Sequence, residues 1–272
     1  MRSALSEWRA GRGRRSSVAA SFGGPYVRSV GWSRFVRSTA RVRETLGSPF
    51  VLCSSPARAR GRGLEALGRG ALEELKLYFD FKSPYAFLAK DPAFALTDRF
   101  DVSLRWIPFI LRIKGKGERS IYSEYKARYS YMDARRWANR RGGFPIKGPL
   151  KVYDSVPSLV GALYAMREGF FRNYADQVYA RFFDRRLEID QPAAVAALVG
   201  ELGHDGAGFL EYLAGPGVAE FEVCQQEAAD DHVFGVPLFV FRGEPFWGYD
   251  RMALLEETMA GAGLARPKGA QR

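Results

Sequence analysis

Apolar residues at every second position predict a β-strand over residues 75–81 (LKLYFDF). A helix is predicted to follow directly, over residues 83–97, because Ser83 is a favoured N-cap residue and Pro84 suits the first helical position. Pro92 is expected to kink this helix or to end it early. The free N–H groups and the dipole at such a helix start favour an anion beside Ser83.

The next residues continue the alternation of strand and helix. Residues 102–110 (VSLRWIPFI) alternate as a second strand, and a strand-helix-strand unit normally gives parallel pairing. A helical block follows, with helical spacing at residues 122–140, 158–168, 174–183, 192–202 and 208–213. Residues 238–241 and 244–247 then form a short hairpin, and residues 251–259 a closing helix. The pattern predicts an α/β fold.

Charge divides the chain at about residue 72. Residues 1–72 hold 14 Arg, no Lys and three acidic residues, whereas the other 200 residues hold 27 basic and 27 acidic residues. This first segment is rich in Ser and Gly and shows no sustained period, so we expect a basic, disordered leader. The domain is expected over residues 73–265, with a helical insert at about 118–215 and a tail at 266–272.

Three interpretations of the leader remain open. It has the composition of an organelle transit peptide, which would place the protein in an organelle matrix. It could instead be a basic arm for nucleic acid, although we do not expect such a partner because the body is neutral overall. We favour a third interpretation, in which the start has been assigned too early, because the body begins cleanly with a strand.

The few cysteines and histidines exclude several classes of protein. Cys53 and Cys224 cannot form a disulfide framework or a zinc site, and His204 and His232 are the only histidines. No stretch of 18 uncharged apolar residues is present. We therefore expect a soluble, cytoplasmic protein without a metal.

Gly235-Val236-Pro237 stands immediately before the strand predicted at 238–241. One interpretation is ordinary punctuation, since a proline at the first residue of a strand is tolerated. The other is a cis Val236-Pro237 bond. It would turn the Val236 N–H and C=O outward to pair with an extended, peptide-like ligand.

Three motifs in order carry a family resemblance. They are residues 81–86 (FKSPYA), residues 233–241 (VFGVPLFVF) and residues 246–252 (FWGYDRM). Together they resemble the DsbA-like thioredoxin-fold superfamily, and within it the 2-hydroxychromene-2-carboxylate isomerases and kappa-class glutathione transferases. The resemblance covers about residues 75–262. It implies a thioredoxin-like fold with a large all-helical insertion between the second and third core strands.

The resemblance also implies how glutathione would bind. In DsbA-like oxidoreductases a C-x-x-C pair starts the first helix, but here Ser83 and Ala86 occupy those places and cannot exchange disulfides. In the isomerase and transferase relatives a serine at this position hydrogen-bonds the glutathione sulfur. The catalytic residue is therefore expected to be Ser83, as a stabiliser of the cofactor's thiolate.

The remaining contacts to glutathione are expected from two other segments. The resemblance implies that Val236 and Pro237 hold the cysteinyl backbone and that Asp250 and Arg251 bind the γ-glutamyl end. Asp250 could also be the N-cap of the last helix. The basic loop after the second strand, at the sheet edge where ligands collect, offers the candidates Lys114 and Lys116; the alternative is a solvated turn.

Aromatic residues supply candidates for a substrate pocket. Residues 133–138 (DARRWA) resemble a segment of the isomerases' insert helix, and Trp137 could wall an aromatic substrate or belong to the core. Tyr85 is the other candidate. Tyr122, Tyr125 and Tyr129 are expected to lie on a helix face that packs on the domain, with a cleft wall as the alternative.

These observations lead to a functional expectation with two rivals. The resemblance implies a glutathione-dependent isomerase or transferase that acts on a small aromatic, anionic substrate. The rivals are a DsbA-like oxidoreductase that works through a partner's thiols and a non-catalytic peptide-binding protein. Whether the chain forms a homodimer stays open.

Overall fold

A computed structural model describes residues 72–112 and 121–267, except for the side chains of residues 121 and 122. The chain divides into two units, Met1–Leu64 and Glu65–Arg272, and all described residues belong to the second unit. The predicted leader therefore lies outside the described residues except for its last residue. The end of the predicted tail, after residue 267, lies outside them as well.

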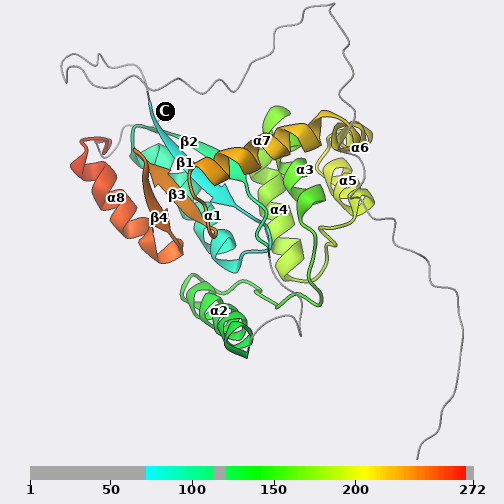
Figure 1. The fold of residues 1–272 in the computed structure, drawn as a ribbon, viewed down its shortest axis with the longest axis horizontal. Coiled ribbons are helices and arrows are strands. Elements are labelled where there is room, and N and C mark those ends of the chain that lie inside the picture. The colour runs from blue at the N-terminus through cyan, green and yellow to red at the C-terminus, as the bar shows by residue number, and fades with distance from the viewer. Residues whose placement is uncertain (1–71, 113–120, 268–272) are drawn as a thin grey trace, which may run out of the picture. The chain divides into compact units, whose positions relative to one another are not determined.

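The described residues form four strands and eight α-helices (Figure 1). In chain order the elements are β1 (Glu73–Phe79), α1 (Pro84–Arg99), β2 (Val102–Pro108), α2 (Ile121–Arg140), α3 (Val156–Arg167), α4 (Phe171–Phe183), α5 (Pro192–Glu201), α6 (Gly206–Ala214), α7 (Pro216–Asp230), β3 (Leu238–Phe241), β4 (Glu244–Trp247), the 3-10 turn η1 (Tyr249–Arg251) and α8 (Met252–Gly261). Six helices, α2 to α7, separate β2 from β3. The predicted α/β fold with a helical insertion between the second and third strands is confirmed.

The sheet has the strand order β2-β1-β3-β4. β1 is parallel to β2, with Glu73 opposite Val102 and Phe79 opposite Pro108, as the strand-helix-strand order predicted. β3 runs antiparallel to β1 and β4 antiparallel to β3. The start of α1 and the loop that leads into β3 therefore meet near the carboxyl end of β1.

The predicted end of the first strand is wrong, and so is the alternative in which Pro92 ends the helix. The first strand ends at Phe79 rather than residue 81, because Asp80 begins a turn in which the Ser83 N–H donates to the Asp80 carbonyl at 3.0 Å. The helix continues through Pro92 instead of ending there. Proline lacks the N–H that would bond the carbonyl four residues earlier, that of Leu88, and the Arg141 guanidinium donates to this carbonyl instead.

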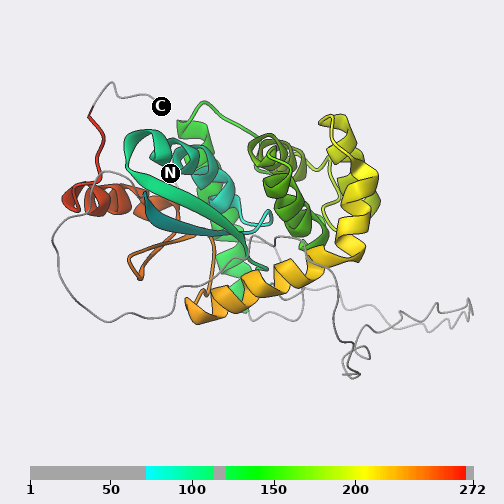
Figure 2. The ribbon, with the colours of Figure 1, turned by 90° about the horizontal axis from the view of Figure 1, so that it is seen from above.

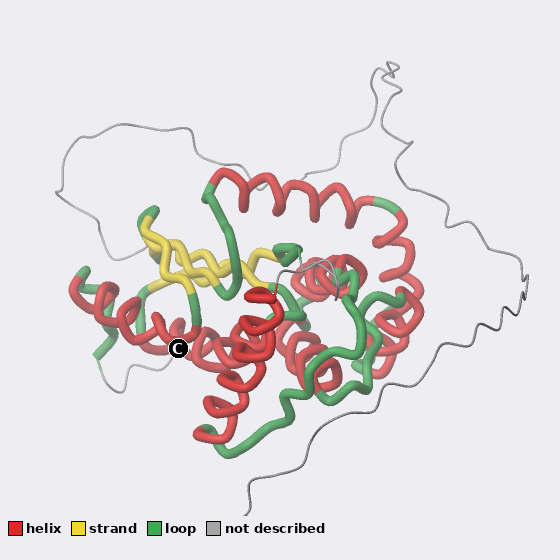
Figure 3. Tube along the Cα trace, turned by 60° about the horizontal axis from the view of Figure 1, so that its bottom comes forward, coloured by secondary structure: helices red, strands yellow, loops and turns green. Residues whose placement is uncertain are grey.

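The two faces of the sheet pack against different helices. Leu75, Leu77 and Phe79 of β1 face a large aromatic core shared with α1, α4 and α8, whereas Tyr78 faces α7 in a smaller cluster with Ala228. Figures 2 and 3 show the sheet lying between α7 on one side and α1 on the other. This alternation along β1 is the period of two that the sequence displays.

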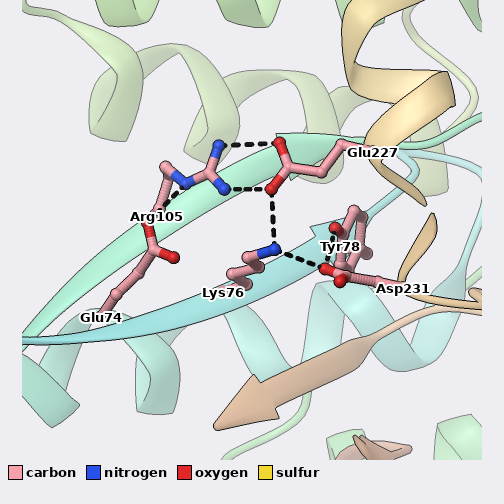
Figure 4. A network of polar contacts seen from close by, with 6 residues as sticks. All are labelled: Glu74, Lys76, Tyr78, Arg105, Glu227 and Asp231. Atoms are coloured by element: carbon pink, nitrogen blue, oxygen red, sulfur yellow. Dashed lines mark hydrogen bonds and ion pairs between the residues drawn. The ribbon is translucent and has the colours of Figure 1, made fainter. Parts of the chain in front are cut away.

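A polar network holds the end of α7 on the sheet (Figure 4). The Lys76 ammonium lies 2.6 Å from Asp231 and 2.9 Å from Glu227, and the Tyr78 hydroxyl donates to Asp231 at 2.5 Å. Arg105 of β2 binds Glu227 as well. Burial of the ring and the bond to Asp231 raise the pKa of Tyr78, which keeps its hydroxyl protonated. The network fixes the chain just ahead of the loop that enters β3.

Candidate functional site

Ser83 is the N-cap of α1, as its sequence context predicted. Its Oγ accepts a hydrogen bond from the Ala86 N–H at 3.2 Å and donates one to the Val236 carbonyl at 2.9 Å. The side chain is buried, with 3% of the residue exposed. A single hydroxyl therefore joins the start of α1 to the loop before β3.

The Val236-Pro237 peptide bond is cis, as one of the two interpretations required. The Val236 carbonyl accepts the hydrogen bond from Ser83, which occupies one of its two lone pairs. The hydrogen bonds of the described residues include none donated by the Val236 N–H. A buried backbone N–H group normally has a hydrogen-bond partner. The Val236 N–H is therefore available to a ligand that enters the cleft.

Ser83 and Val236 line a cleft of about 1290 Å³. Every described residue that the sequence proposed for the site lines this cleft: Ser83, Tyr85, Trp137, Val236, Pro237, Asp250 and Arg251. The structure thus brings together residues from both halves of the chain. Lys114 and Lys116 lie outside the described residues, but Arg112 of the same basic stretch lines the cleft.

Asp250 is not the N-cap of the last helix, and that alternative is wrong. The helix α8 begins at Met252 after an intervening 3-10 turn, and Asp250 lies within that turn, 2.9 Å from Arg251. The turn depends on Gly248, whose φ of +108° suits glycine. A Cβ added there would also lie 2.6 Å from an Asp250 carboxylate oxygen. The Asp250 side chain lines the cleft and is more than half exposed.

The insertion helix α2 forms the opposite wall. The Tyr85 hydroxyl donates to the Asp133 carboxylate at 3.0 Å, and Trp137 makes an edge contact with Tyr249, ring centres 5.3 Å apart. Burial and the neighbouring Asp133 carboxylate raise the pKa of Tyr85. Trp137 satisfies both interpretations, because it packs against the aromatic core and also lines the cleft.

The expectation that Tyr125 and Tyr129 pack on the domain is wrong. Both are more than half exposed, at 59% and 52%, and Tyr129 lines the cleft. Exposed apolar residues continue along the segment after α2, where Leu150 is 70% exposed and also lines the cleft. The side chain of Tyr122 lies outside the described residues. The helical spacing of the tyrosines could not distinguish a packed face from a cleft wall.

Sequence reasoning missed the buried acid beneath the site. The Asp80 carboxylate is fully buried and accepts hydrogen bonds from the Leu111 N–H at 2.7 Å, the Lys82 N–H at 2.9 Å and the Ser155 hydroxyl at 3.1 Å. The Lys82 ammonium lies 3.5 Å away. Burial raises the pKa of Asp80, while these donors oppose the shift. A carboxylate inside an apolar run was the available signal.

The described residues offer neither a cluster of metal ligands nor a membrane-spanning helix. No group of three or more His, Cys, Asp or Glu side chains that could hold a metal ion occurs within residues 72–112 and 121–267. None of the helices in that part of the chain combines the length and apolar character needed to cross a membrane.

The sequence of the described domain matches a known family. A model of the DSBA-like thioredoxin domain matches residues 74–260. The chain belongs to this family. Its matched segment includes both Ser83 and Val236, but no cysteine stands at the start of α1. Cys224 lies on α7 and packs against the opposite face of the sheet.

Curated relatives in this family carry the name of one enzyme. The chain is 28% identical over 190 residues to the 2-hydroxychromene-2-carboxylate isomerase of Pseudomonas putida, covering 67% of this chain and 92% of that protein. It is 27% identical to the enzyme of the same name from Pseudomonas sp. strain C18, covering 68% and 89%. Both relatives are named as isomerases, which supports the conclusion that this protein is an enzyme.

Solved structures show the same fold. A 2-hydroxychromene-2-carboxylate isomerase structure is 25% identical with a TM-score of 0.59, covering 70% of this chain and 96% of that one. A probable DsbA oxidoreductase from Streptomyces coelicolor has a TM-score of 0.57 at 16% identity, covering 72% and 93%. The second similarity concerns the fold alone.

Proposed function

We propose that this protein is a glutathione-dependent isomerase or transferase that acts on a small aromatic, anionic substrate such as a 2-hydroxychromene-2-carboxylate. The observation that carries the proposal is the pairing of the Ser83 hydroxyl with the Val236 backbone at the start of α1. The names of the relatives support the reaction class. The absence of cysteine at the helix start disfavours dithiol exchange by this chain alone.

The polar groups around Ser83 fit a small peptide thiol. The Val236 N–H suits a peptide carbonyl, and the Asp250 carboxylate suits an ammonium group at the ligand's other end. When bound, glutathione supplies a sulfur nucleophile that adds to a conjugated double bond and later leaves. The cleft is large enough to hold such a ligand and a bicyclic substrate together.

Ser83 has a defined part in stabilising negative charge. Its Oγ already accepts from the Ala86 N–H, so the hydroxyl proton is the group that it can offer to a ligand. That proton now points to the neutral Val236 carbonyl. A charged acceptor in the cleft forms a stronger hydrogen bond than a neutral one, and the dipole of α1 adds to the preference. Rotation about the Cβ–Oγ bond is all that the switch requires.

The test combines calorimetry with titration of the bound thiol. We expect the protein to bind glutathione and to lower the pKa of its thiol. Ser83→Ala should raise this pKa and lower kcat/KM on 2-hydroxychromene-2-carboxylate about a hundredfold. Ser158→Ala is the control, because Ser158 is a buried serine of α3 that bonds the Ser155 carbonyl outside the cleft.

Three results would contradict the proposal. Unchanged thiol titration and turnover in Ser83→Ala would remove the role of Ser83. No glutathione binding at millimolar concentration would favour a peptide-binding protein. Turnover of a mixed disulfide with a partner thiol, without isomerase or transferase activity, would favour an oxidoreductase.

A further inference from the structure

Lys82 places a buried positive charge in the floor of the cleft. Only 7% of the residue is exposed, yet it lines the cleft beside Ser83. Its Nζ donates to the Leu111 carbonyl at 2.9 Å and lies 3.5 Å from the Asp80 carboxylate. An ammonium has three N–H groups, so these two described partners leave one donor for a group in the cleft.

A second buried lysine shows what a purely structural ammonium looks like. Lys90 of α1 is 5% exposed and pairs with the carboxylates of Asp91 and Asp176. It does not line the cleft. Lys90 thus pairs with two carboxylates away from the cleft. Lys82 pairs with one carboxylate and lies beside Ser83 in the cleft lining.

The surroundings of Lys82 do not cancel its charge towards the cleft. Among the described residues, the one carboxylate that contacts the Lys82 ammonium is that of Asp80, and it also accepts hydrogen bonds from two backbone N–H groups and from the Ser155 hydroxyl. From α4, the neutral Tyr179 hydroxyl lies near the Asp80 carbonyl. After β2, Arg112 adds a second positive charge to the lining. The local balance therefore favours an anion.

We propose that Lys82 and Ser83 together form the anion site that holds the thiolate of bound glutathione. The inference rests on the proposed function and adds a second stabilising group to it. Ser83 supplies a directed hydrogen bond, and Lys82 supplies a fixed charge that is shielded from water. A positive charge beside a thiol lowers its pKa more effectively in such a site than on an exposed surface.

The test is the pH titration of the thiolate absorbance of glutathione bound to the full-length protein. Lys82→Met should raise the pKa of the bound thiol by about 1, and Lys82→Arg should leave it near the wild-type value. Activity of Lys82→Met should fall near neutral pH and recover at a pH above the raised pKa. A purely structural defect would not recover in this way. Lys90→Met is the matched control, and we expect it to leave the thiol pKa unchanged.

A further variant guards against misfolding. Lys82→Met leaves Asp80 without its charged partner, so the double variant Asp80→Asn/Lys82→Met removes both charges and should show the same raised thiol pKa. If it titrates like the wild type, the inference is wrong. It is also wrong if Lys82→Met raises only the KM for the anionic substrate, since the charge would then serve the substrate.

The two proposals fail in different ways. If the wild-type protein does not bind glutathione, the proposed function fails and takes the role of Lys82 with it. If glutathione binds and Ser83→Ala shifts the thiol pKa while Lys82→Met does not, only the role of Lys82 is overturned.

Discussion

The two walls of the cleft are built in different ways. The wall that carries Ser83 and Val236 consists of buried turns at one end of the two central strands, and hydrogen bonds to the backbone hold these turns. The opposite wall consists of α2 and the segment after it, where side chains such as Tyr129 and Leu150 are largely exposed. The first wall fixes polar groups and the second presents apolar surface.

This difference separates two tasks within one site. Groups that stabilise charge must be held in place, because their effect depends on orientation. An apolar wall can tolerate changes, because contact with a substrate depends mainly on the area that it covers. We therefore expect substitutions in the first wall to affect folding and chemistry, and substitutions in the second wall to affect substrate affinity.

The sharpest way to break the first wall is to remove its buried carboxylate. Asp80→Ala leaves the Lys82 ammonium, the Leu111 N–H and the Ser155 hydroxyl without their acceptor. We expect the free energy of unfolding to fall by about 3–5 kcal/mol in urea denaturation. Glu168→Ala is the control, because the side chains of Glu168 and of its partner Arg167 are both exposed; its loss should cost at most about 1 kcal/mol. Equal losses would contradict this account of the wall.

A charge on the second wall should change affinity without unfolding the protein. Leu150→Asp is expected to raise the KM for an aromatic substrate about fivefold to tenfold, because apolar contact is lost, while kcat stays unchanged. Leu254 of α8 is also an exposed leucine, but it does not line the cleft. Leu254→Asp should therefore leave the KM at the wild-type value. Steady-state kinetics distinguish the two. The same KM for both variants would mean that Leu150 does not touch the substrate.

The junction of the two walls should respond least. Tyr85→Phe removes the hydrogen bond to Asp133 that links α1 with α2, at a cost of about 1 kcal/mol. Hydrogen exchange of α2 amides should then accelerate about fivefold. Tyr212→Phe removes a comparable bond to Glu220 elsewhere and should leave α2 exchange unchanged. No acceleration in Tyr85→Phe would show that other contacts hold α2.

Local signals in the sequence were sufficient for the strand and the helix start that carry Ser83. The strand period around Leu77 and the serine-proline start of α1 depend on neighbouring residues, and both predictions are confirmed. The cis bond before Pro237 came from the resemblance, because proline statistics alone favour trans. Its meeting with Ser83 required the order of the strands in the sheet.

The errors arose where distant residues decide the local structure. Pro92 does not end α1 because Arg141, from the end of α2, satisfies the Leu88 carbonyl. Asp80 binds Leu111, which follows β2, and Ser155, which precedes α3; no local sequence pattern predicts these contacts. The exposure of Tyr129 depends on how far α2 lies from the core, which helical spacing does not encode.

The bond between the Ser83 hydroxyl and the Val236 carbonyl joins residues 153 positions apart in the chain. During synthesis, Ser83 leaves the ribosome long before its acceptor exists, and until then it can act only as the cap of a helix. A nascent chain that ends before β3 lacks Val236, so it cannot yet form the anion site that we propose.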